Sequence, residues 1–117
     1  MAQQQGMGYR GKVDTISEEE ARGRLEGLPG WEYAHGRIRK QFVFRTFLRA
    51  IAFVNTVANL AEAAKHHPDM TINYNKVTLR LITHSDGALT ERDFDLARRI
   101  EQLPMVGLVE DRGDTAG

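Results

Sequence analysis

The chain has 117 residues, enough for one domain with a buried core and too few for two. Apolar residues make up 41% of it and charged residues 27%, as in an ordinary globular domain. The formal net charge is zero and there is no cysteine. These values argue against a protein that binds nucleic acid through its own charge, and they exclude a disulfide framework, a thiolate nucleophile and a cysteine-based zinc site.

The two ends of the chain predict tails around a single domain. Residues 1–12 are rich in Gln and Gly and lack the apolar segment of a secretory signal, and residues 110–117 are polar. No apolar run approaches the roughly 20 residues that span a bilayer. We therefore expect a cytoplasmic protein with no membrane segment, a domain over residues 13–109, and disordered tails at 1–12 and 110–117.

The first third of the domain predicts a helix followed by a β-hairpin. Ser17 and Glu20 have the spacing of a capping box, and the helix that follows should end in the Gly- and Pro-rich segment 27–30. Segments 31–33 and 38–44 alternate apolar and polar residues as strands do, and Lys40 interrupts the apolar face of the second segment. His35-Gly36 between them predicts a tight turn, in which His35 is a solvated turn residue.

The middle of the chain predicts a long helix over Thr46–His66, the strongest helical pattern in the sequence. Apolar residues recur there at intervals of three and four, at Phe47, Ile51, Val54, Val57 or Ala58, and Ala61. Pro68 should end the helix, because the residue before a proline is disfavoured in the α region.

The last third predicts a second hairpin and a final helix. Met70–Tyr74 and Val77–Thr83 read as strands with a turn at Asn75-Lys76, and Thr90 with Asp93 forms a capping pair before the last amphipathic helix. The order α-β-β-α-β-β-α predicts an α+β fold, a four-stranded antiparallel sheet with three helices packed on one face. The exposed edges of such a sheet favour a homo-oligomer.

Three of the four histidines fall near the ends of predicted elements. His66 and His67 are adjacent at the end of the long helix, so their side chains should point about 100° apart, and His84 ends the fourth strand. Histidine can both give and take a proton near neutral pH, so this trio could serve general acid–base catalysis. Two alternatives stay open: histidines that merely stabilise a helix C-terminus, and a three-histidine zinc site, which adjacent ligands on one helix fit poorly.

The histidines belong to a longer pattern that resembles a known family. Glu62-Ala63-Ala64-Lys65-His66-His67-Pro68 is followed after five residues by Tyr74, after nine more by His84 and after eight more by Asp93. This spacing resembles the signature of the pterin-4a-carbinolamine dehydratases, and the resemblance covers roughly residues 17–103.

The resemblance implies the fold predicted above, assembled as a homodimer or homotetramer. It implies a lyase, 4a-hydroxytetrahydrobiopterin dehydratase, which removes water from a 4a-hydroxytetrahydropterin to give the quinonoid dihydropterin. This reaction recycles the tetrahydropterin cofactor of aromatic amino-acid hydroxylases, so functional coupling to such a hydroxylase is expected. The family needs no metal and no organic cofactor.

The resemblance also assigns site residues by position. His66, His67 and His84 match the catalytic histidines, and the substrate-contacting stretches match Lys65, His66, His67, Ile82, Thr83, His84 and Ser85. Asp93 could support the site or simply be the N3 acid of the last helix, and Glu62, one helical turn before His66, could orient that ring or be a solvated carboxylate. Tyr74 is expected to pack in its strand.

Two positions depart from the family pattern. Met70 stands where many relatives carry an aromatic residue, and Ser85 where some carry an acid. These departures affect the wall and the polar rim of the expected pocket and leave the histidine trio intact.

Two other classes of function remain open. Some members of the family act as dimerisation cofactors of a homeodomain transcription factor; an exposed apolar stripe on the long helix, around Phe47, Ile51 and Val54, would favour such a binding module. A structural or metal-binding protein that kept the motif without the activity is the other alternative.

Overall fold

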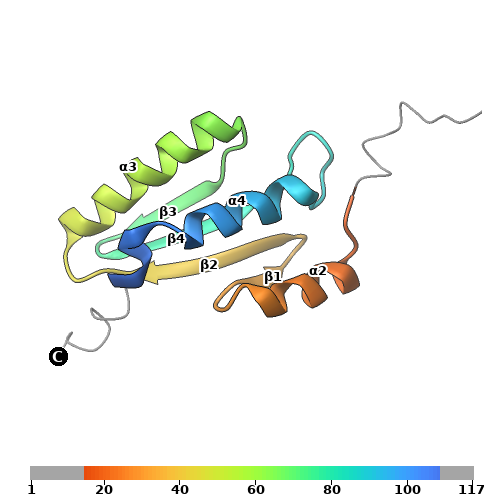
Figure 1. Ribbon diagram of the computed structural model, residues 1–117, viewed down its shortest axis with the longest axis horizontal. Coiled ribbons are helices and arrows are strands. Elements are labelled where there is room, and N and C mark those ends of the chain that lie inside the picture. The colour runs from red at the N-terminus through yellow and green to blue at the C-terminus, as the bar shows by residue number, and fades with distance from the viewer. Residues whose placement is uncertain (1–14, 109–117) are drawn as a thin grey trace, which may run out of the picture.

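The computed structural model describes residues 15–108 and has the predicted α+β architecture (Figure 1). The four strands form one antiparallel sheet in the order β1-β2-β4-β3, with the helices packed against one face, which confirms the predicted fold class. The predicted tails lie outside the described residues. The elements are α2 (Glu18–Arg24), η2 (Leu25–Gly27), β1 (Glu32–Ala34), β2 (Arg37–Val43), α3 (Phe47–Ala64), β3 (Asp69–Asn73), β4 (Lys76–Leu81), α4 (Glu91–Glu101) and η3 (Pro104–Leu108).

The N-terminal elements follow the local signals closely. The Ser17 hydroxyl accepts a hydrogen bond from the Glu20 amide and caps α2, which ends in the short 3₁₀ helix η2. His35 and Gly36 both have positive φ angles, 52° and 81°, as the two central residues of a type I′ hairpin turn require. The predicted hairpin and the exposed turn position of His35 are thus confirmed.

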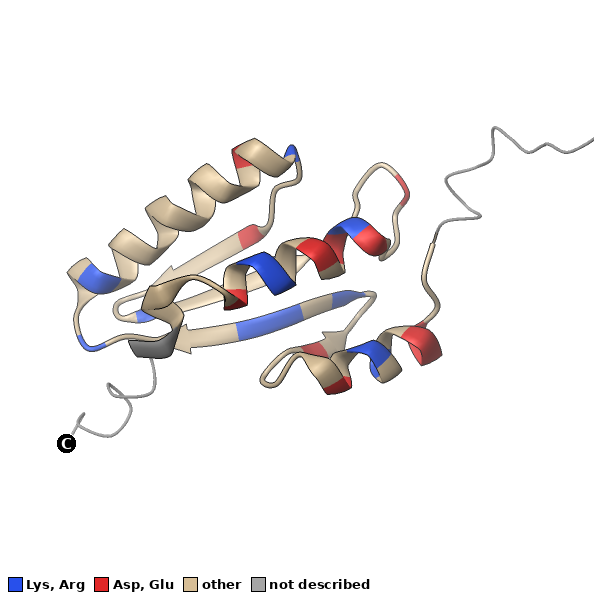
Figure 2. Cartoon of the chain, viewed as in Figure 1, with Lys and Arg blue, Asp and Glu red and all other residues tan. Residues whose placement is uncertain are grey.

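The long helix α3 buries only part of the apolar stripe found in the sequence. Its buried residues are Ala50, Phe53, Val57 and Ala61, whereas Phe47 is 46% exposed. Val57 and Ala61 of the stripe are buried, while Ile51 and Val54 are half-buried. Because α3 carries no charged residue between Arg49 and Glu62, its apolar periodicity does not define one face (Figure 2).

The end of α3 and the second hairpin also differ from the prediction. Lys65 adopts the left-handed conformation, with φ 54°, and ends the helix before Pro68 can do so. The turn between β3 and β4 lies at Tyr74-Asn75, one residue earlier than predicted, and Tyr74 is 66% exposed rather than packed in a strand. The Asn75 amide group donates to the carbonyl of Phe44 (2.7 Å), which ties this turn to the connection between β2 and α3.

The core lies between the helices and the inward face of β2 and β4. Ile38 is opposite Leu81 and Phe42 is opposite Val77, and all four are completely buried. Phe53 of α3 packs on Phe42, with ring centroids 4.8 Å apart. This contact holds α3 against the sheet, and only residues 65–68 separate its C-terminal end from the start of β3.

Lys40 lies between Ile38 and Phe42 on the inward face, the position that interrupts the apolar alternation of β2. Its ammonium group donates to Glu101 Oε2 (2.7 Å) and to the carbonyl of Pro29 (3.1 Å). The Trp31 indole N–H donates to the same Glu101 oxygen (2.8 Å). This network joins β2, the end of α4 and the loop before β1.

No helix among residues 15–108 is both long and apolar enough to cross a membrane.

Candidate functional site

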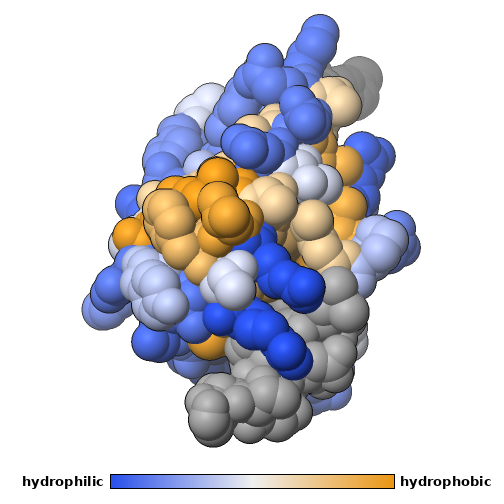
Figure 3. All heavy atoms as spheres, turned by 90° about the vertical axis from the view of Figure 1, so that its left-hand side faces the viewer, coloured by the Kyte–Doolittle hydropathy of each residue, from blue (hydrophilic) through white to orange (hydrophobic). Residues whose placement is uncertain are grey.

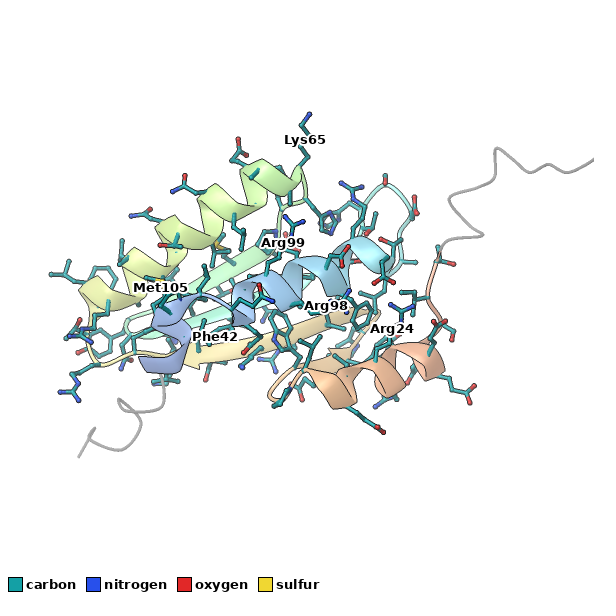
Figure 4. All side chains as sticks on the ribbon, in the orientation of Figure 1. Arg24, Phe42, Lys65, Arg98, Arg99 and Met105 are labelled. Carbon is teal, nitrogen blue, oxygen red and sulfur yellow. The ribbon has the colours of Figure 1, made fainter. Side chains whose placement is uncertain are left out.

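The end of α3 points two adjacent histidines in different directions. The left-handed Lys65 stops the helical rotation, so His66 turns into the protein and is only 7% exposed, while His67 lies on the surface. The Lys65 side chain points away from the molecule (Figure 4), and its carbonyl accepts a hydrogen bond from Arg92 Nη2 (2.7 Å). Of the predicted contact residues, Lys65 therefore faces the site with its backbone only.

A buried carboxylate connects the candidate segments. Asp93 is completely buried, and its Oδ1 lies 2.5 Å from His66 Nε2. Its Oδ2 accepts hydrogen bonds from the Thr83 hydroxyl and the Thr90 amide, both at 2.9 Å. Asp93 is thus both the N3 acid of a complete capping box and the partner of a histidine, and it joins the end of α3, the segment after β4 and the first turn of α4.

The hydrogen bonds around Asp93 fix the orientation of the His66 ring. An ionised carboxylate only accepts hydrogen bonds, so Nε2 of His66 is the donor to Asp93 Oδ1 when Asp93 is ionised. In the neutral ring the other nitrogen, Nδ1, then has a free lone pair and can accept a proton.

His84 lies beside this network but on the surface. His84 was predicted to end the fourth strand, but β4 already ends at Leu81 and His84 lies in the turn that follows. Its neighbour Thr83 pairs with Ala88 in an isolated bridge, which closes this turn. The His84 side chain is 63% exposed, with Nε2 3.8 Å from Asp69 Oδ2.

Glu62 contacts His67 and not His66, the ring that it could have oriented. Its Oε2 lies 2.6 Å from Nε2 of His67, with both side chains exposed, and not against His66. The reason is again Lys65: because its left-handed conformation breaks the helical spacing, His66 no longer lies one turn above Glu62.

Two surface hollows flank the Asp93 network. One, of about 290 Å³, is lined by His66 and Arg92 together with residues of α3 and α4. The other, of about 570 Å³, is lined by Thr83, Ser85 and Arg92. Ile82, between β4 and Thr83, is half-buried.

The sequence prediction did not include Arg92 and Asp69. Arg92 lines both hollows and holds the backbone just before His66, while Asp69 is the carboxylate nearest His84. Arg92 could have been found from its place beside Asp93 in the first turn of a capped helix. Asp69 carried no such signal, because its proximity to His84 depends on the pairing of β3 with β4.

Among residues 15–108, no three His, Cys, Asp or Glu side chains are grouped closely enough to hold a metal ion. The zinc alternative therefore has no donor set in this part of the chain.

Comparison with known proteins gives a consistent result for most of the chain. The family model described as pterin 4 alpha carbinolamine dehydratase matches residues 14–103. A relative from Acidobacterium capsulatum, named for the same dehydratase, is 54% identical over 80 residues, which cover 68% of this chain and 87% of that protein. One from Picosynechococcus, named likewise, is 46% identical over 88 residues, which cover 75% of this chain and 96% of that protein.

Solved structures show the same fold. A transcriptional coactivator/pterin dehydratase from Brucella melitensis is 34% identical, with a TM-score of 0.70, and the match covers 74% of this chain and 95% of that one. A pterin dehydratase-like protein identified as a RuBisCO assembly factor in the alpha-carboxysome has a TM-score of 0.53 at 22% identity, over 66% of this chain and 87% of that one. The second likeness concerns the fold alone.

Proposed function

The chain belongs to the pterin 4 alpha carbinolamine dehydratase family, and on this basis we propose that it removes water from a 4a-hydroxytetrahydropterin to give the quinonoid dihydropterin. The observation that carries the proposal is the buried His66–Asp93–Thr83 network next to His84. It presents one histidine with an oriented ring and one exposed histidine on a neighbouring segment, as a reaction with two proton transfers requires.

The reaction breaks the bond between C4a and the hydroxyl oxygen and forms a double bond between C4a and N5. The hydroxyl group gains a proton and leaves as water, and N5 loses its proton. In our proposal His66 accepts the N5 proton at Nδ1, while Asp93 holds the other ring nitrogen and stabilises the imidazolium. His84 supplies the proton to the hydroxyl, and His67, paired with Glu62, binds the substrate and assists.

The remaining residues of the proposed site surround these histidines. The backbone of Lys65 and the segment Ile82–Ser85 would contact the pterin, with Thr83 and Ser85 lining one hollow. Met70, half-buried on β3, replaces the aromatic residue of many relatives and should broaden the range of accepted pterins. Tetrahydrobiopterin as the natural form, coupling to an aromatic amino-acid hydroxylase and a cytoplasmic location remain part of the proposal.

The first test is the rate of carbinolamine dehydration, followed by ultraviolet absorbance, with the substrate generated in place by an aromatic amino-acid hydroxylase. The protein should accelerate the spontaneous reaction. His84→Ala and His66→Ala should each reduce turnover about 10²- to 10⁴-fold, because each removes one proton-transfer group. His35→Ala, which alters an exposed histidine in the β1–β2 turn, is the matched control and should keep full activity.

Full activity in folded His84→Ala would refute the assigned role. A rate that stays constant from about pH 5 to 9 would argue against imidazole as the proton carrier.

We also propose that the exposed face of α3 is an interface between copies of this chain. Phe47 and Leu48 are 46% and 77% exposed, and Ile51 and Val54 beside them are half-buried. The end of the molecule at which α3 begins shows apolar side chains gathered on its surface (Figure 3). The Brucella protein is named a coactivator as well as a dehydratase. Binding of a different protein on this face is therefore the second outcome of the test.

The oligomeric state in solution tests this interface. Wild-type protein should sediment as a dimer or tetramer, and Leu48→Glu should shift it to a monomer because a charge replaces an exposed apolar contact. Gln102→Glu, which adds the same charge at an exposed position at the end of α4, is the control and should keep the oligomer. A monomeric wild-type protein would direct the search to a different partner.

A further inference from the structure

The open face of the sheet, opposite the helices, carries an unusual row of charges. Side chains alternate along each strand, so the residues next to the inward ones in the sequence point to the other face. One row crosses all four strands in the order Glu32, Arg39, Arg80, Asp69. Two arginines thus face each other directly at its centre, and Arg37 lies two residues from Arg39 on the same face. Figure 2 shows the basic residues along β2.

The carboxylates at the two ends of the row leave one of the two central arginines, Arg80, without an ion-pair partner among residues 15–108. Glu32 pairs with Arg39, while Asp69 pairs with Arg37 (2.9 Å) and not with Arg80, its partner in the sheet register. Arg80 donates from Nη1 to the Thr71 hydroxyl (3.0 Å) and has no carboxylate within ion-pair distance among residues 15–108. Its remaining N–H donors are therefore free of a charged partner.

A hollow of about 570 Å³ lies over this centre. Its walls are Glu32, Ala34, His35, Arg37, Arg39 and Arg80. Arg39 and Arg37 each have a carboxylate partner, so within the described part of the chain the unpaired charge of the hollow is that of Arg80. Like charges directly opposite each other in an antiparallel pair are unfavourable, and a bound anion would remove this repulsion.

From this arrangement we propose that the hollow is a phosphate-binding site, separate from the histidine site. The planar guanidinium group matches two oxygens of a phosphate at once, and two opposed arginines can hold one phosphate from both sides. Arg39 and Arg80 bind the phosphate and Arg37 adds charge at the rim. The phosphate is either the free ion or the monoester of a small molecule, since the hollow opens to solvent and is larger than the ion.

The test is a calorimetric titration of the full chain with inorganic phosphate at constant ionic strength. Wild-type protein should show saturable binding to one site, and Arg80→Gln should weaken it at least tenfold. Arg49→Gln removes an exposed arginine on α3, away from the hollow, and should bind as the wild type does. Glycerol phosphate, titrated in the same way, separates the two sources: tighter binding than phosphate identifies a monoester site, and equal or weaker binding identifies a site for the free ion.

A second variant keeps the test decisive if Arg80→Gln folds poorly. Glu32→Gln removes the carboxylate that competes for Arg39, so it should bind phosphate more tightly than the wild type. The proposal is overturned by the absence of saturable binding in the wild type, by an equal loss in Arg49→Gln, or by weaker binding in Glu32→Gln.

Discussion

Asp93 performs two tasks with one buried carboxylate. It caps α4 through the Thr90 amide and orients His66 through Nε2. Asp93→Asn keeps the shape of the side chain but replaces an acceptor by a donor, so either a Thr or the His66 hydrogen loses its partner. We expect the free energy of unfolding to fall by about 1–3 kcal/mol and the dehydration rate to fall with it.

Denaturant unfolding measures this loss. Asp95→Asn, which changes an exposed carboxylate of the same helix, is the control and should change stability by less than about 0.5 kcal/mol. Equal stabilities of Asp93→Asn and Asp95→Asn would contradict the structural role assigned to Asp93.

The loop before β1 depends on close packing against Lys40. Gly30 has φ 90°, and a Cβ there would come within 2.8 Å of Lys40 Cε, which Glu101 and Pro29 hold in place. Gly36 has a similar φ of 81° but open space around it. Gly36→Ala should therefore lower the free energy of unfolding only by the cost of a left-handed backbone at an alanine, about 1–2 kcal/mol. Gly30→Ala should lower it clearly more.

Thermal or denaturant unfolding of both alanine variants checks this difference. In a Lys40→Ala background the excess cost of Gly30→Ala should disappear, because the atom that would collide is gone. An excess that persists without the lysine side chain would show that the loop backbone, and not Lys40, limits the position.

The first turn of α4 is also held by ion pairs to its neighbours. Hydrogen bonds from Arg24 of α2 and then from Arg98 hold the pKa of Glu91 below its ordinary value of 4.5. A carboxyl group with a lowered pKa in the folded state stabilises the protein above pH 4.5, and this contribution is lost as the pH falls through the lowered pKa. Because the Glu91 side chain is 54% exposed, the contribution should stay below about 1 kcal/mol.

Glu91→Gln should accordingly be slightly less stable than the wild type at pH 7, and the difference should shrink toward pH 3. The measurement is urea unfolding across this range at low salt, since salt weakens exposed pairs. Glu26→Gln, which alters an exposed carboxylate of η2, should show no such trend. A difference that grows as the pH falls would contradict the assigned pairing.

For the molecule as a whole, short-range sequence signals predicted the order of helices and strands. They did not predict the features that depend on contacts between elements far apart in the sequence. The caps at Ser17 and Thr90 and the His35-Gly36 turn are encoded within a few residues, and all three are confirmed. The buried face of α3 could not be predicted, because an almost uncharged helix offers several apolar faces and the contact between Phe53 and Phe42 selects one.

The candidate site shows the same division. The spacing of the motif brought out His66, His67, His84 and Asp93, but not which histidine Asp93 or Glu62 contacts. That choice depends on the left-handed conformation of Lys65, which a lysine gives no reason to expect. Asp69 comes near His84 only through strand pairing, so no short-range pattern reveals it.

The double role of Asp93 has a consequence for experiments that select active variants from a random library. In the proposed mechanism, substitutions at position 93 would be lost for two inseparable reasons, since the same carboxylate caps a helix and orients His66, the proposed proton acceptor. The His84 side chain is 63% exposed, so variants there should survive a selection for abundance and, under the proposed mechanism, fail one for turnover. Comparing the two selections position by position would therefore separate the residues that this protein keeps for chemistry from those it keeps for folding.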